Sequence, residues 1–67
     1  MWVVVYMAEG KIRAEQILDL LTGEGFLAKA KPVYKNTGPE ENLYEIIVPK
    51  SEVSEAHKAI EECRHLL

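Results

Sequence analysis

The sequence has little of what small domains use for covalent or metal stabilisation. It contains one cysteine, Cys63, which cannot form an internal disulfide. A secretory signal has a basic segment ahead of its apolar run, and this sequence shows no such segment. The longest apolar run, residues 1–7, is far shorter than the ~20 residues that span a bilayer. We therefore expect a cytoplasmic protein in a reducing compartment, with no membrane contact.

Length and composition indicate a small globular domain. The 67 residues form a single domain, residues 1–67, and 48% of them are hydrophobic, which is too many for a disordered chain. Dinucleotide-binding and pyridoxal-phosphate folds need far more chain, so no cofactor is expected. A chain of this length buries only about 60% of its unfolded surface. Because neither a disulfide nor an evident metal site adds stability, we expect a homodimer or a higher homo-oligomer.

Hydrophobic periodicity in the first half predicts a strand and a helix. Residues 2–6 form an apolar run without charge, which favours a strand covered on both faces and broken by residues 7–10. Residues 11–22 are amphipathic with helical spacing, and the glycines that follow end the helix. The apolar stripe of this helix comprises Ala14, Ile17, Leu18 and Leu21.

The period changes to two in the middle of the chain. From Phe26 to residue 31 apolar and polar residues alternate, as in a half-exposed strand, and Pro32 places this strand at an edge or ends it. The polar segment 35–42 is suited to a mobile connection. Residues 43–48 give a third strand.

The last segment is predicted to be a second amphipathic helix. Ser51 is expected to cap its first turn, where Glu52 and Glu55 favour the positive end of the helix. Apolar residues then recur at spacings of three and four. This stripe comprises Val53, Ala56, Ile60, Cys63 and Leu67, with Ala59 and Leu66 at its margins.

The order β-α-β-β-α predicts an α+β fold, a ferredoxin-like two-layer sandwich. A right-handed crossover joins the first two strands, and an antiparallel hairpin joins the second and third. Placing the third strand between the other two gives a three-stranded sheet in the order 1-3-2, with both helices on one face. The complete fold has a fourth strand, which is not expected here. The apolar first strand would then lie at an open edge.

The face of the sheet away from the helices is a candidate interface. Its expected members are Leu27, Lys29, Lys31, Glu45 and Ile47, joined either by Trp2, Val4 and Tyr6 or by Val3 and Val5. Exposed Trp and Tyr side chains would form a patch that needs a partner. The alternative is that Met1 and Trp2 fold over their own core. We predict self-association, or binding of a protein partner, through Trp2, Val4, Tyr6, Leu27 and Ile47.

Metal binding and nucleophilic catalysis are not expected. The soft metal ligands are His57, Cys63 and His65, and two of these, Cys63 and His65, point about 200° apart on one helix. Helix capping accounts for Ser51 and Ser54, and no histidine or acid is spaced for a catalytic triad. We predict no catalytic residue.

Nucleic-acid binding is not expected either. The net charge is -3, whereas an RNA-recognition domain of this fold presents a basic surface with several aromatics on its central strands. The central strand here offers Tyr44, Glu45 and Ile47.

One basic turn suggests a ligand site. Gly10, Lys11 and Arg13 put positive charge at the positive end of a helix, which is how a helix terminus becomes an anion or phosphate site. The alternative is a solvated turn offset by Glu9 and Glu15.

Residues spread over nearly the whole chain resemble a known family. They are the opening strand through Tyr6, Ala14-Glu15 with Leu18 and Leu21, Glu24-Gly25-Phe26, and Val48-Pro49 followed by Ala56. The family comprises very small bacterial, prokaryotic signal-transducing proteins, whose fold is related to that of the nitrogen-regulatory PII proteins. The resemblance implies a ferredoxin-like fold and a binding or regulatory role. The sequence departs from the PII proteins in lacking the fourth strand and in having only residues 35–42 in place of their long loop. No nucleotide-binding motif of those proteins can be placed on it, so the resemblance does not extend to ATP or 2-oxoglutarate sensing.

Three functions follow from these patterns. The first is a non-enzymatic regulatory or protein-interaction module that self-associates. The second is a sensor of a small anionic ligand or metabolite that uses Lys11, Arg13 and Lys35. The third is an acylphosphatase-like enzyme, which needs an arginine before the first helix and an asparagine on the sheet. For that role Arg13 with Asn36 or Asn42 is a poor match.

Overall fold

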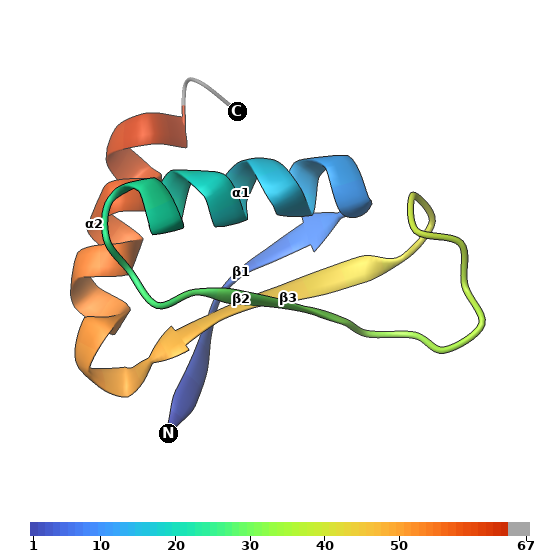
Figure 1. Ribbon diagram of the computed structural model, residues 1–67, viewed down its shortest axis with the longest axis horizontal. Coiled ribbons are helices and arrows are strands. Elements are labelled where there is room, and N and C mark those ends of the chain that lie inside the picture. Colours follow the sequence, from blue (N-terminus) through green and yellow to red (C-terminus); the bar gives the residue numbers. More distant parts are fainter. Residues whose placement is uncertain (65–67) are drawn as a thin grey trace.

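The computed structural model describes residues 1–64 and has an α+β fold (Figure 1). Strands β1 and β2 each pair antiparallel with the central β3, so the sheet order is β1-β3-β2. This confirms the predicted ferredoxin-like βαββα arrangement. The elements are β1 (Trp2–Glu9), α1 (Lys11–Gly23), β2 (Lys29–Pro32), β3 (Leu43–Pro49), a 3₁₀ turn (Lys50–Glu52) and α2 (Val53–Cys63).

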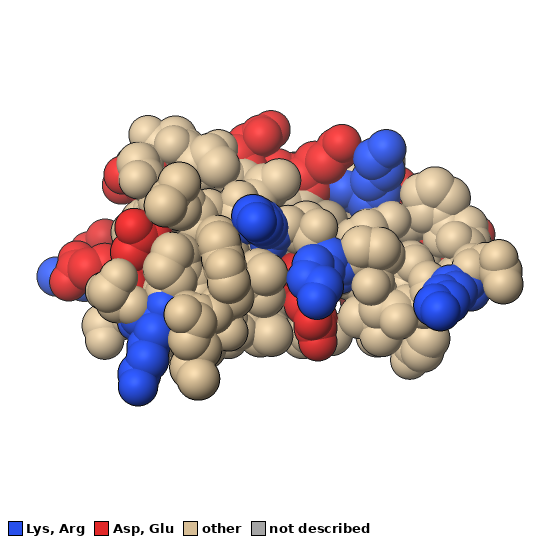
Figure 2. Space-filling view, turned by 60° about the horizontal axis from the view of Figure 1, so that its bottom comes forward, with Lys and Arg blue, Asp and Glu red and all other residues tan. Residues whose placement is uncertain are grey.

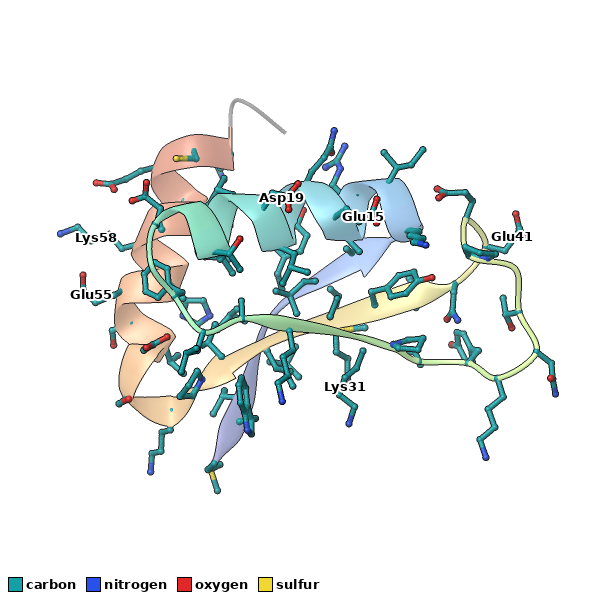
Figure 3. All side chains as sticks on the ribbon, viewed as in Figure 1. Glu15, Asp19, Lys31, Glu41, Glu55 and Lys58 are labelled. Atoms are coloured by element: carbon teal, nitrogen blue, oxygen red, sulfur yellow. The ribbon has the colours of Figure 1, made fainter. Side chains whose placement is uncertain are left out.

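Both helices pack on the same face of the sheet. In Figure 1, α1 lies along the sheet and α2 crosses it at a steep angle. Their polar side chains point outward, as Glu15 and Asp19 of α1 and Glu55 and Lys58 of α2 show in Figure 3. The buried side chains of both helices and of the sheet form one cluster. It comprises Val5, Ala8, Ala14, Ile17, Leu21, Ile46, Val48, Ala56, Ala59 and Ile60.

Strand β1 is longer and more exposed than the sequence predicted. It continues to Glu9 because the residues after Tyr6 pair with β3, and Ala8 is fully buried among the core side chains. The prediction that both faces of this strand are covered is wrong. Trp2 is 43% exposed and Val4 is 41% exposed, since no helix lies on their side of the sheet.

A β-bulge divides β1 into two faces that the sequence did not reveal. Val4 pairs with Ile47 and Tyr6 pairs with Ile46, which leaves Val5 as the extra residue. Trp2 and Val4 therefore lie on the open face, whereas Tyr6 lies on the helix-covered face and packs against the core. Neither of the two expected sets is correct, because the bulge changes the face in the middle of the strand.

Strand β2 begins at Lys29, three residues later than predicted, but its alternation is confirmed. Lys29 pairs with Ile47 and Lys31 pairs with Glu45 on the open face. The strand ends at Pro32, at the edge of the sheet. Ala30 is half-buried on its core side, and Phe26 and Ala28, which precede the strand, pack against the same core.

Helix α1 keeps its predicted start but differs in one apolar contact. Leu20 packs against the core cluster, whereas Leu18 is only half-buried and is not among the side chains packed against that cluster. None of the helices within residues 1–64 is long and apolar enough to cross a membrane.

Helix α2 begins after a 3₁₀ turn instead of at a serine cap. Ser51 lies inside that turn, and no side chain caps either helical segment, so the predicted cap is wrong. Glu52 instead accepts a hydrogen bond from the Leu27 N–H at 3.1 Å, which ties the start of α2 to the chain entering β2. Cys63 is half-buried at the end of α2. Three residues named above lie outside the described part of the chain: His65, Leu66 and Leu67.

Candidate functional site

The predicted anion site lies at the N-terminus of α1, where groups of the protein itself accept hydrogen bonds from the helix amides. The Lys11 N–H donates to the carbonyl oxygen of Pro39 at 3.1 Å, and the Ile12 N–H donates to Glu40 Oε2 at 3.2 Å. These are amides that a helix leaves without intrahelical partners. The helix dipole also favours a carboxylate here. Glu40 therefore occupies the position that we predicted for an external anion.

Gly10 makes the close approach of Glu40 possible. It has φ +85° and ψ 155°, a conformation that L side chains rarely adopt. Its N–H donates to the Asn42 carbonyl oxygen at 2.8 Å. A Cβ at this position would lie 2.7 Å from Glu40 Oε1. The glycine thus permits both the turn and the contact with the connection between β2 and β3.

Asn42 organises that connection, a structural role that its place in the sequence does not reveal. It is 3% exposed, and its Oδ1 accepts from the Tyr34 N–H at 3.0 Å and the Leu43 N–H at 2.8 Å. Its Nδ2 donates to the Tyr34 carbonyl oxygen at 2.9 Å. Residues 35–42 are predicted to be a mobile connection, but Asn42 joins the two residues that flank this segment, Tyr34 and Leu43, by hydrogen bonds. An asparagine next to a predicted strand is a turn signal, but it does not identify its partner.

Arg13 is separated from the other two predicted anion ligands. Gly10 and Lys11 contact the β2–β3 connection, whereas Arg13 lines two cavities together with Tyr6. Neither cavity includes Asn36 or Asn42, and the Asn42 amide is already engaged by Tyr34. These two cavities thus do not assemble the arginine and asparagine of an acylphosphatase site.

Two cavities beside β1 share Tyr6 and Arg13 in their linings, and we call them together the β1 groove. The larger part has a volume of about 450 Å³ and lies between α1 and α2. The smaller part has a volume of about 310 Å³ and lies along the strand. The larger part is lined by Tyr6, Arg13, His57, Ile60, Glu61 and Arg64, the smaller by Tyr6, Met7, Glu9 and Arg13.

The open face of the sheet presents apolar side chains around the central strand. Lys31 points to this side, away from α1 (Figure 3), and Figure 2 shows this side with separate basic and acidic side chains among neutral ones. Lys29 Nζ lies 4.5 Å from the centroid of the Trp2 ring, within the range of a cation–π contact. Because β1 and β2 flank β3, this contact crosses the central strand. It explains why Ile47 is only 8% exposed on a face without helices.

The predicted interface residues are only partly brought together. Trp2, Val4 and Ile47 are neighbours on the open face. Leu27 is 65% exposed but precedes β2, and Tyr6 lies on the opposite face. Met7, which is 47% exposed, joins the open face because it follows the bulge and pairs with Glu45. The sequence does not mark Met7 as an interface residue, because an uninterrupted apolar run does not show where the two faces of the strand exchange.

The side chains that could hold a metal are dispersed. Within residues 1–64 no three His, Cys, Asp or Glu side chains are close enough to share a metal ion. His57 lines the larger part of the β1 groove, and Cys63 is a free thiol.

Comparisons of the chain with protein-family models, with curated proteins and with solved structures find no match. The resemblance to the signal-transducing family therefore stays a prediction.

Proposed function

We propose that this protein is a non-enzymatic interaction module that self-associates through the edge of β1 and the adjoining open face. A second copy would add its own β1 beside the first, which extends the sheet and covers the exposed apolar side chains. We further propose a regulatory role, which the resemblance to prokaryotic signal-transducing proteins supports, and a cytoplasmic location, which the single free thiol supports.

The contrast between the two edges of the sheet carries this proposal. The β2 edge has four residues, of which Lys29, Lys31 and Pro32 are of the types that prevent strand addition. The β1 edge has eight residues, of which only the last, Glu9, is charged. Natural proteins protect or cover long apolar edges. The bulge at Val5 is the one interruption along β1, so the described chain protects one edge well and the other poorly.

The open face beside β1 supports the same conclusion. Trp2, Val4 and Met7 are each more than 40% exposed and follow one another along the strand. Two antiparallel β1 strands related by a two-fold axis would place both sets on one continuous surface. Such an isologous contact is self-complementary, and two-fold dimers are the commonest soluble homo-oligomers.

Sedimentation of the whole chain from micromolar to millimolar concentration tests the proposal. The expected result is a mass above the 7.6 kDa monomer that rises with concentration. Val4→Lys places a charge on the exposed face of β1 and should lower the association constant at least tenfold, which is about 1.4 kcal/mol.

Val33→Lys is the matched control. Val33 is 39% exposed but follows β2, away from the β1 edge, so this variant should associate like the original chain. A 7.6 kDa monomer at millimolar concentration would overturn the proposal. Equal weakening by both variants would also overturn it, because the effect would then come from charge and not from the edge.

A further inference from the structure

The larger part of the β1 groove is a separate candidate site. Its volume of about 450 Å³ lies within the range of cavities that hold small molecules. Each layer of the fold contributes to it: Tyr6 comes from the sheet, Arg13 from α1 and Ile60 from α2. Self-association through the β1 edge and the open face would use the backbone of β1 and the side chains of Trp2, Val4 and Met7, none of which lines this cavity, so the site goes beyond the function proposed above.

The charges around this cavity favour an anion. Arg13 and Arg64 are both at its wall, with Glu61 as the one acid. Glu61 lies 3.6 Å from Arg64, and both side chains are about 70% exposed, so their ion pair contributes little. Among residues 1–64 no ion pair involves Arg13. The chain as a whole carries a net charge of -3, so this cationic wall is a local exception.

The other charged residues of the β1 groove indicate which of its two parts would hold an anion. Glu9 lines the smaller part, where its carboxylate would repel an anion, and no second arginine lies there. The larger part instead adds Arg64 and the imidazole ring of His57, which has an N–H that can donate a hydrogen bond. Arg13 is shared by both parts and can pair in the larger one. A guanidinium binds carboxylate and phosphate groups through two parallel hydrogen bonds.

The floor of the cavity adds an apolar surface. Tyr6 is half-buried and packs against the core, and Ile60 is 8% exposed. Packing in the core holds both side chains in place, so they offer a ready surface for a ring or a short aliphatic chain. We propose that the cavity between α1 and α2 binds a small organic anion, with its apolar part on Tyr6 and Ile60 and its carboxylate or phosphate paired with Arg13.

Nuclear magnetic resonance titration of the labelled full-length chain tests this site. The probes are benzoate and phenyl phosphate, with benzyl alcohol as the neutral molecule of similar shape and inorganic phosphate as the anion without a ring. Both aromatic anions should shift the amide signals of Tyr6, Arg13 and Ile60 in a saturable way at millimolar concentration. The tighter of the two identifies the preferred anionic group. Benzyl alcohol should produce no saturable shift, and inorganic phosphate should bind more weakly than phenyl phosphate.

Variants connect the binding to the cavity. Arg13→Gln should weaken binding of the aromatic anions about tenfold, and Arg13→Lys by less, because lysine keeps the charge but loses the paired hydrogen bonds. Lys11→Gln removes the same charge two residues earlier on an exposed side chain that lines neither cavity, so its affinity should match that of the original chain. Arg64→Gln, at an exposed position, supplies a second variant and should weaken binding several-fold.

Three results would overturn the proposal. The first is the absence of saturable shifts with either aromatic anion, whether the chain is monomeric or associated. The second is equal weakening by Arg13→Gln and Lys11→Gln, which would show attraction by net charge alone. The third is a set of shifts confined to residues 10–12, which would place the anion at the helix N-terminus. Self-association is measured separately by sedimentation, so its failure and the failure of this site are distinguishable.

Discussion

Gly10 and Gly23 lie at the two ends of α1 and differ in whether a side chain could replace their hydrogen. Gly10 has φ +85°, and a Cβ there would lie 2.7 Å from Glu40 Oε1, whereas a Cβ at Gly23 would meet nothing within 4 Å. Gly10→Ala should therefore lower the free energy of unfolding by about 1–3 kcal/mol. Gly23→Ala should raise the free energy of unfolding by about 0.5–1 kcal/mol. Alanine readily adopts the helical conformation of residue 23, and it lowers the conformational entropy of the unfolded chain.

Urea denaturation of both variants measures this pair. The two substitutions are chemically identical, so each serves as the control for the other. Equal effects of the two variants would show that neither the positive φ nor the contact with Glu40 limits position 10.

The residues that organise the loops could be recognised by type but not by partner. Asn42 is a turn-forming residue type, and Glu40 is a loop acid in the sequence. Glu40 contacts Ile12 across 28 positions, and no local pattern encodes a contact at that separation. The sequence therefore indicates an anion at the α1 terminus, but it does not show that the chain supplies the carboxylate itself.

At the scale of elements, alternation decides how much the sequence could reveal. Residues 26–31 alternate, so both faces of the strand β2 were assigned correctly even though its first residue was not. Residues 2–7 are all apolar, so nothing in them marks the bulge at Val5. A shift of one residue exchanges the two faces of a strand. Tyr6 was consequently assigned to an interface with Trp2 and Val4, from which the structure separates it.

The start of α1 depends on a contact with the β2–β3 connection, which gives a second prediction. Glu40→Ala removes the acceptor of the Ile12 N–H and should lower the free energy of unfolding by about 0.5–2 kcal/mol. Glu40→Gln keeps an oxygen acceptor but loses the favourable interaction with the helix dipole, so its loss should be smaller. Thermal or urea denaturation provides the measurement.

Glu41→Gln is the neighbouring control. Glu41 is exposed on the same connection and points outward in Figure 3, so its replacement should leave stability within about 0.5 kcal/mol. Inorganic phosphate should recover part of the stability of Glu40→Ala, because the freed amides again need an anion. A Glu40→Ala variant as stable as Glu41→Gln would contradict the proposed capping role.

At the scale of the whole molecule, topology was predictable and surface pairing was not. Five elements in a fixed order, a right-handed crossover and one hairpin leave few ways to arrange three strands. That is why the order β1-β3-β2 followed from the sequence. The groove between the helices depends on the angle at which α2 crosses the sheet. Periodicity does not encode that angle, so the proximity of Arg13, His57 and Arg64 was not foreseen.

The single tryptophan makes the proposed association visible. Trp2 is the only indole in the chain, is 43% exposed on the open face, and lies under Lys29 Nζ. If a second copy covers this face, Trp2 loses contact with water. Its emission should then shift to the blue as concentration rises, in step with the mass measured by sedimentation. Val4→Lys should keep the emission of the dilute protein over the same range.

Lys29→Met distinguishes the effect of Lys29 on Trp2 emission from the effect of a second copy. It removes the cation but keeps a long side chain over Trp2, so the emission of the dilute protein should change while its dependence on concentration remains. Because methionine also removes a protecting charge from the β2 edge, association of this variant should be equal to or stronger than that of the original chain. A rising mass with constant Trp2 emission would mean that the copies associate without covering the open face. The open face would then be free for a different partner, and the exposed β1 edge alone would have to account for self-association.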